Sequence, residues 1–145
     1  MPDPAQRGQP FSPALHLQLD CTFAAVRQGA SEIRAFLHDR GLLEKDIWAC
    51  ELAFVEGCNN AVEHTPDTHT ASKIMVELSL APGHIELRIK DHSQGCDFPP
   101  DSSLPPAYAE RGRGIFLIRS LMDDVVYLRS SSSNCLVLKK AITGI

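Results

Sequence analysis

The segment Glu51–His64, ELAFVEGCNNAVEH, combines a helical apolar pattern with a stripe of polar residues on one side. In a helix, Glu56 and Asn60 are four residues apart and share a face, and Glu63 and His64 follow one turn later. The remaining circumference is mostly apolar, so we expect a largely buried helix, in which unpartnered polar groups cost free energy. Two interpretations are open: the polar pair hydrogen-bonds to nearby backbone, or it forms a site.

The composition limits the classes of protein that the chain can belong to. Its 145 residues fit one domain, with 43% hydrophobic and 22% charged residues, as in soluble globular proteins. No apolar run is long enough to cross a bilayer. The net charge of −4 and the pI of about 5.8 argue against a protein that mainly neutralises nucleic-acid phosphates. Residues 1–13 are proline-rich and lack a secretory signal pattern, so we expect a flexible leader before a single domain at 14–145.

The cysteines and histidines indicate neither a disulfide framework nor a zinc site. The five cysteines are odd in number and show no Cys-x-x-Cys spacing, which favours reduced thiols and a cytoplasmic protein. The six histidines do not cluster with them in the spacing of zinc ligands.

Apolar periodicity predicts the order of helices and strands. The expected elements are an edge strand near 15–20, a helix from Thr22 to Arg40 that Gly41 ends, a helix from Glu44 to His64, a hairpin of 74–80 and 85–89, a long loop from His92 to Gly112, a helix near 115–122, and a hairpin of 125–128 and 136–138. Hairpins require antiparallel pairing, so we predict an α+β fold. Its helices cover one face of a mixed, mainly antiparallel sheet in a two-layer sandwich, with Trp48 and Cys58 in the core.

Three features follow one another along the chain. They are Glu56 with Asn60, then Asp91 before Ser93-Gln94-Gly95, then Gly112-Arg113-Gly114 at the start of a helix. Each alone has an ordinary interpretation as a turn or a loop end. Together they resemble the N, G1 and G2 boxes of the GHKL ATPase superfamily, whose members share the Bergerat ATP-binding fold.

The resemblance is most specific to the compact bacterial branch of that superfamily. The segments EGCNNAVEH and GRGIFLIRSLMDDV look most like the anti-sigma-factor serine protein kinases of partner-switching systems. The similarity spans roughly residues 15–141. It implies ATP and Mg²⁺ as cofactors.

The resemblance also implies a role for each matching residue of the first two boxes. Asn60 matches the oxygen ligand of magnesium, a hard cation that takes few protein ligands. Glu56 matches the general base that acts on the attacking serine hydroxyl. Asp91 matches the carboxylate that accepts a hydrogen bond from the adenine amino group, and Gly95 matches the glycine that lets the loop approach the base.

The third box is expected to bind phosphate. Gly112 and Gly114 match glycines whose amides, near a helix N-terminus, can face phosphate oxygens. Arg111 and Arg113 lie beside them in the sequence and either add positive charge to the site or are solvated residues of a lid. By the resemblance, the lid covers about residues 92–112.

Two segments depart from the pattern of the family. The G1 box usually reads Asp-x-Gly-x-Gly, and here Ser93 replaces the first glycine, which is tolerable if its backbone angles are ordinary. The C-terminal hairpin often carries a Gly-Thr pair near the adenine, whereas this chain has Ser133-Asn134-Cys135. One adenine contact is therefore missing or replaced. We expect His64 to be structural rather than catalytic.

The resemblance implies protein partners rather than nucleic acid or a membrane. They are a STAS-domain anti-anti-sigma factor, phosphorylated on serine, and a sigma factor that the kinase alternately sequesters; a homodimer is also expected. The sequence lacks a helix with a phosphorylatable histidine and a transducer domain, which disfavours histidine kinases and topoisomerases. Two alternatives stay open: a non-catalytic sequestering module of the same fold with weak or lost nucleotide binding, and a fragment of a larger sensor kinase.

Overall fold

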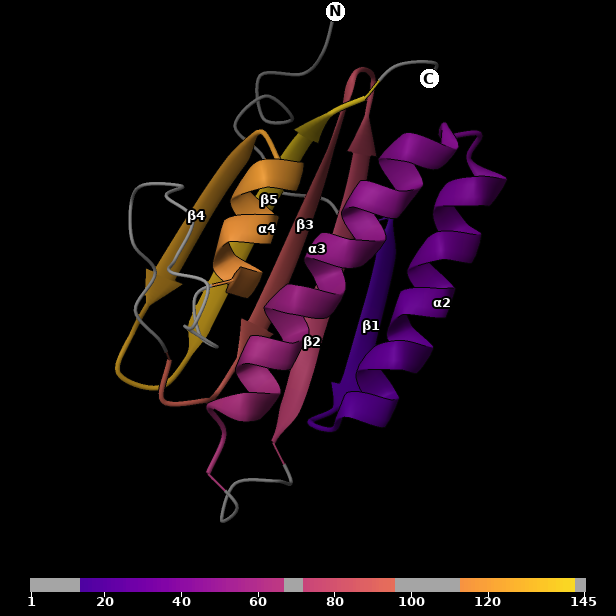
Figure 1. Ribbon diagram of the computed structural model, residues 1–145. Helices are drawn as coiled ribbons and strands as arrows, with labels where there is room; N and C mark the ends of the chain where they lie inside the picture. Colours follow the sequence, from indigo (N-terminus) through magenta and orange to yellow (C-terminus); the bar gives the residue numbers. More distant parts are fainter. Residues whose placement is uncertain (1–13, 67–71, 96–112, 143–145) are drawn as a thin grey trace, which may run out of the picture.

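A computed structural model describes residues 14–66, 72–95 and 113–142 (Figure 1). Its elements are β1 (Leu15–Asp20), α2 (Phe23–Asp39), α3 (Glu44–Glu63), β2 (Lys73–Ala81), β3 (His84–Asp91), α4 (Arg113–Leu121), β4 (Asp124–Arg129) and β5 (Asn134–Ala141). They agree in type and order with the elements predicted from periodicity. The expected leader at 1–13 and the part of the expected lid at 96–112 lie outside the described residues.

The strands form one sheet in the order β1-β2-β3-β5-β4, with β1 at an edge as predicted. The helices lie together on one face of this sheet (Figure 1), which confirms the two-layer α+β architecture. The sheet was expected to be mixed, but every pairing between described strands is antiparallel. The reason is that β5 inserts between β3 and β4, which run in the same direction and are therefore not neighbours.

The core lies between the sheet and the helices because apolar residues alternate along each strand. In β3, Ile85, Leu87 and Ile89 are buried, and Asp91 continues the same inward-facing series. In β5, the inward series begins at Asn134. Two polar residues therefore stand at the end of the apolar face of adjacent strands.

Helix α2 begins and ends at the predicted signals. The Thr22 side chain accepts a hydrogen bond from the backbone N–H of Ala25 at 3.1 Å, as an N-cap does. Gly41, with a φ of 83°, follows the helix in the left-handed region. The residues predicted to face the core, Val26, Ala30, Ile33 and Leu37, are all buried.

One residue of α3 was predicted wrongly. Cys58 is fully buried as expected, but Trp48 is 52% exposed. The buried residues of α3 recur three or four apart along a stripe that includes Phe54, and Trp48 lies on the opposite side of the helix. An aromatic side chain in an apolar segment was assigned to the core, although its helical phase placed it outside.

Four of the five cysteines lie within the described residues. Cys21, Cys50, Cys58 and Cys135 are free thiols. In the part of the chain that the structure covers, no group of three or more potential metal ligands among His, Cys, Asp and Glu occurs. No described helix combines the length and the hydropathy needed to traverse a bilayer.

Candidate functional site

The N-terminus of α4 lies against the polar stripe of α3. A β-carbon built on Gly114 would stand 2.7 Å from Glu56 Oε2 and 3.8 Å from Asn60 Oδ1. The structure thus brings together three predicted site residues from segments more than fifty positions apart in the sequence. A side chain at 114 would displace the end of the Glu56 side chain.

The side chains of Glu56 and Asn60 on α3 make no hydrogen bonds with the neighbouring described residues. Within residues 14–66, 72–95 and 113–142, neither the Glu56 carboxylate nor the Asn60 amide has a hydrogen-bond partner. Pairing with nearby backbone, the first interpretation of the stripe, is therefore not observed. Both side chains are half-buried and remain available to a ligand.

The environment of Glu56 makes its carboxylate more basic. Burial raises the pKa of Glu56 above its ordinary value, and the negative charge of Glu63 on the same helix raises the pKa further. A carboxylate with a raised pKa accepts a proton more readily near neutral pH. This electrostatic setting suits a general base.

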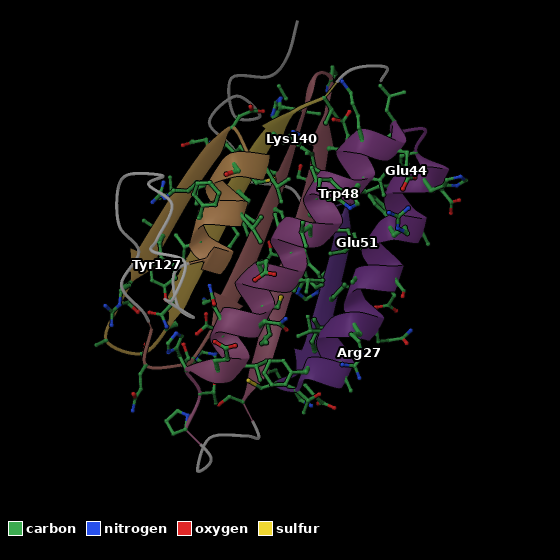
Figure 2. The ribbon with its side chains drawn as sticks, viewed as in Figure 1. Arg27, Glu44, Trp48, Glu51, Tyr127 and Lys140 are labelled. Atoms are coloured by element: carbon green, nitrogen blue, oxygen red, sulfur yellow. The ribbon has the colours of Figure 1, made fainter. Side chains whose placement is uncertain are left out.

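A pocket lies beside the stripe, between α3 and the sheet. It is lined by Gly57, Asn60, Ala61, His64, Ile89, Asp91, Ser93, Tyr127 and Leu136. Tyr127, labelled in Figure 2, reaches it from the edge strand β4. Asn60 belongs both to this pocket and to the surface that faces Gly114. The pocket has apolar walls with a few polar groups, as binding sites for flat heterocycles commonly do.

Asp91 is the buried acid of the pocket, with 6% of its surface exposed. Its Oδ1 accepts hydrogen bonds from the Ser93 backbone N–H at 2.8 Å and from Asn134 Nδ2 at 3.1 Å. A buried carboxylate needs such donors to offset its loss of hydration. Asp91 is therefore held by the loop that follows it and by the neighbouring strand.

The loop after Asp91 accommodates the serine that departs from the family pattern. No described residue other than glycine has a positive φ, so Ser93 has ordinary backbone angles. The Ser93 hydroxyl accepts a hydrogen bond from the Gly95 N–H at 3.1 Å. Gly95 has a φ of 79°, and a β-carbon there would lie 2.8 Å from Arg129 Nε. The turn thus requires glycine at 95 but not at 93.

Tyr127 and Asn134 were not assigned to the site from the sequence, and Asn134 contacts the buried acid of the pocket. Asn134 is 3% exposed and pairs directly with Asp91 in the register of β3 and β5. One signal in the sequence could have identified Asn134. It is the first residue of the alternating pattern of β5, and it is polar where that pattern calls for an apolar, inward-facing residue. The register that sets it beside Asp91 was not visible in the sequence.

The structure describes some of the predicted site residues only in part or not at all. Arg111 and Gly112 lie outside the described residues. Arg113 is the first residue of α4, and its side chain is not among those described. His64 lines the pocket, and its backbone N–H donates to the carbonyl of Asn60 at 3.1 Å.

The oxygens of Glu56 and Asn60 suit a magnesium ion bound with a nucleotide. Magnesium takes oxygen ligands in an octahedron and is usually held by one or two protein groups together with phosphates and water. The carboxylate and the amide oxygen converge on one point beside Gly114. Asn60 would hold the ion, which would neutralise phosphate charge there.

Comparison with known protein families agrees with this arrangement. The family profile described as the histidine kinase-like ATPase domain matches residues 19–140, most of the chain. The chain belongs to the histidine kinase-like ATPase domain family. The resemblance to GHKL proteins that the three boxes indicated is thereby confirmed.

Relatives within the histidine kinase-like ATPase family include serine-protein kinases. The chain is 28% identical over 108 residues to the serine-protein kinase RsbW of Bacillus thuringiensis (strain Al Hakam) and to that of Bacillus cereus (strain AH820). In both cases, the match covers 68% of this chain and 67% of the relative. The similarity supports the expected branch of anti-sigma-factor kinases.

Solved structures share the fold. The RsbU and RsbW domains of a Mycobacterium tuberculosis protein match with a TM-score of 0.70 and 22% identity, over 94% of this chain and 34% of that chain. The SiaB–SiaC complex of Pseudomonas aeruginosa matches with a TM-score of 0.62 and 11% identity, over 96% of this chain and 94% of that chain. The chain spans about a third of the length of the mycobacterial protein.

Proposed function

We propose that the chain is an ATP-dependent serine protein kinase and anti-sigma factor. It would phosphorylate a STAS-domain anti-anti-sigma factor and alternately sequester a sigma factor. The observation that carries this proposal is the convergence of Glu56 and Asn60 on the N-terminus of α4, beside a pocket that contains Asp91. The similarity to serine-protein kinases named RsbW favours serine as the phosphorylated residue.

The pocket and the α4 N-terminus would divide the binding of ATP between them. Asp91 would accept a hydrogen bond from the adenine amino group in the pocket that Ile89 and Leu136 also line. The amides at the start of α4, including that of Gly114, would face the phosphates. Asn60, placed between these two regions, would hold the magnesium ion that accompanies the nucleotide.

Glu56 would act on the protein substrate rather than on the nucleotide. Its carboxylate would accept the proton of the serine hydroxyl as that oxygen attacks the terminal phosphorus of ATP, and ADP would leave. The raised pKa and the lack of a hydrogen-bond partner among the described residues leave this carboxylate able to take the proton. The lid at about 92–112 would close the site, with Arg111 and Arg113 beside the phosphates.

The direct test is phosphotransfer from ATP with Mg²⁺ to a STAS-domain protein encoded near this gene. Phosphoserine should form, and Glu56→Gln should lower the rate by about 10²- to 10⁴-fold, the usual contribution of a general base. Nucleotide affinity should change little. Glu32→Gln, which removes an exposed glutamate of α2, is the matched control and should keep the wild-type rate.

Two outcomes would contradict the proposal in different ways. Full activity in Glu56→Gln would remove Glu56 from its assigned role. Failure of the wild-type protein to bind ADP or ATP in calorimetry with Mg²⁺ would favour the non-catalytic sequestering module. Sigma-factor binding and homodimer formation are tested separately, by co-purification with and without ATP and by light scattering.

A further inference from the structure

Ser93 and Asn134, which belong to the two segments that depart from the family pattern, contact each other. Asn134 Nδ2 donates to the Ser93 carbonyl at 3.0 Å and lies 3.4 Å from the Ser93 hydroxyl. The same nitrogen donates to Asp91 Oδ1 at 3.1 Å. Two of these partners, a carbonyl and a carboxylate oxygen, can only accept, so the amide must present its nitrogen to them.

These contacts hold one oxygen of Asp91 from two directions. Oδ1 accepts from the Ser93 N–H and from Asn134 Nδ2. Among the described residues, the structure shows no hydrogen bond to Oδ2. The carboxylate is therefore anchored through Oδ1, while Oδ2 has no protein donor within that part of the chain.

The hairpin between β4 and β5 fixes the loop on which Ser93 lies. Arg129, which pairs with Asn134 across the hairpin, donates from Nη2 to the Gln94 carbonyl at 2.8 Å. On the other side, the Gln94 N–H donates to the His64 carbonyl at 3.2 Å. The loop is thus held between the hairpin and the C-terminal end of α3. Such preorganisation lowers the ordering cost when a ligand binds.

We propose that Ser93 and Asn134 are a matched pair of positioning residues that orient Asp91 and thereby set the preference for adenine over 6-oxopurines. The inference rests on the proposed nucleotide site. With Oδ1 held by two donors, Oδ2 accepts a hydrogen bond from the 6-amino group of adenine. Hypoxanthine presents a 6-oxo group instead, and its oxygen would face the carboxylate without an intervening proton.

The test compares the binding of ADP and IDP, with Mg²⁺ present, by isothermal titration calorimetry. IDP differs from ADP in carrying hypoxanthine, so the ratio of the two dissociation constants reports the contact with the 6-amino group. Asn134→Ala should lower the preference for ADP by about 10-fold, the effect expected from one buried hydrogen bond to a charged group. Ser131→Ala, at an exposed position of the same hairpin, is the matched control and should keep the wild-type ratio.

The contact between Ser93 and Asn134 leads to a second prediction. Ser93→Gly removes only the hydroxyl contact with Asn134 and keeps both backbone contacts, so it should lower the preference for ADP less than Asn134→Ala does, and it should have no further effect in the Asn134→Ala background. Ser93→Gly changes a partly exposed loop and keeps the test decisive if Asn134→Ala does not fold. Circular dichroism establishes that each compared variant is folded.

The outcomes separate this inference from the proposed function. A lowered ratio in the single variants, with no further loss when Ser93→Gly is added to Asn134→Ala, supports the pair. Unchanged ratios in folded variants, or equal weakening of ADP and IDP, would show a merely structural role and overturn the inference while the kinase proposal stands. A wild-type protein that binds neither nucleotide would overturn both.

Discussion

Gly114 lies against the carboxylate of Glu56, and 2.7 Å separates Glu56 Oε2 from the position that a β-carbon on Gly114 would occupy. This contact joins the start of α4 to the polar stripe of α3. It places a helix N-terminus, with its partial positive charge, beside an acid that has no hydrogen-bond partner in the described part of the chain. The spatial arrangement of the candidate site depends on this close contact between α4 and α3.

The first prediction concerns Gly114→Ala. In an open helix, this substitution would stabilise the protein by about 1 kcal/mol, because alanine has the higher helix propensity. Here the new methyl group meets the end of the Glu56 side chain, which must turn away, so we expect a smaller gain in stability and at least a roughly 10-fold lower phosphotransfer rate, since small misplacements of reacting groups are costly. Urea denaturation and the kinase assay measure the two effects.

A double variant tests whether Glu56 is the cause. In the Glu56→Ala background, the carboxylate is gone, and Gly114→Ala should give the full gain in stability that propensity alone predicts. An equal change in stability on Gly114→Ala in both backgrounds would show that the contact with Glu56 is not responsible.

The second prediction concerns pH and Glu56. Burial and the charge of Glu63 raise the pKa of Glu56 in the folded protein. The folded state then holds the proton more tightly than the unfolded state, so this group's contribution to stability is greatest at low pH and falls as the pH rises from the unfolded pKa through the folded pKa. We expect Glu56→Gln to reduce this decline and to raise the melting temperature at neutral pH.

Melting temperatures between pH 4 and pH 8 provide the comparison for wild type, Glu56→Gln and Glu63→Gln. Removing the Glu63 charge should lower the pKa of Glu56 and give part of the same effect. A steeper pH dependence in Glu56→Gln than in the wild type would contradict the raised pKa.

The third prediction concerns Gly57, which lets α3 approach the sheet. A β-carbon at Gly57 would lie 2.8 Å from Leu136 Cδ2 and 3.0 Å from Ile89 Cδ1, and both of those residues line the pocket. We expect Gly57→Ala to cost about 1–3 kcal/mol through overpacking and to weaken ADP binding, because α3 must shift. Chemical denaturation and calorimetry test this. Recovery of both properties in Gly57→Ala with Leu136→Val would identify overpacking as the cause.

The fourth prediction contrasts two aromatic residues of α3. Phe54 has no exposed surface, and its replacement by alanine should cost about 3–5 kcal/mol. Trp48 is 52% exposed, and Trp48→Ala should cost far less. Since Trp48 is the single tryptophan of the chain, acrylamide should quench the fluorescence of the native protein nearly as well as that of the unfolded protein. Strong protection from quenching would contradict the exposed position.

Periodicity was sufficient to predict the elements because burial of one face imposes it on the sequence. The alternation in Ile85, Leu87 and Ile89 identified β3, and the cap at Thr22 and the glycine at 41 identified the ends of α2. Periodicity failed at Trp48, because residue type was given more weight than helical phase. It could not exclude a mixed sheet, because strand order depends on contacts between distant segments.

The sequence by itself determined which residues were candidates for the site and in which order they occur: Glu56 and Asn60 one helical turn apart, then Asp91, then Gly114. Local spacing on a helix or strand carries that information. Only the tertiary structure decided that Gly114 contacts Glu56 and that Asn134 stands beside Asp91. These contacts depend on the packing of α4 against α3 and on the register of β3 with β5, which are set by burial of the whole core rather than by any one segment.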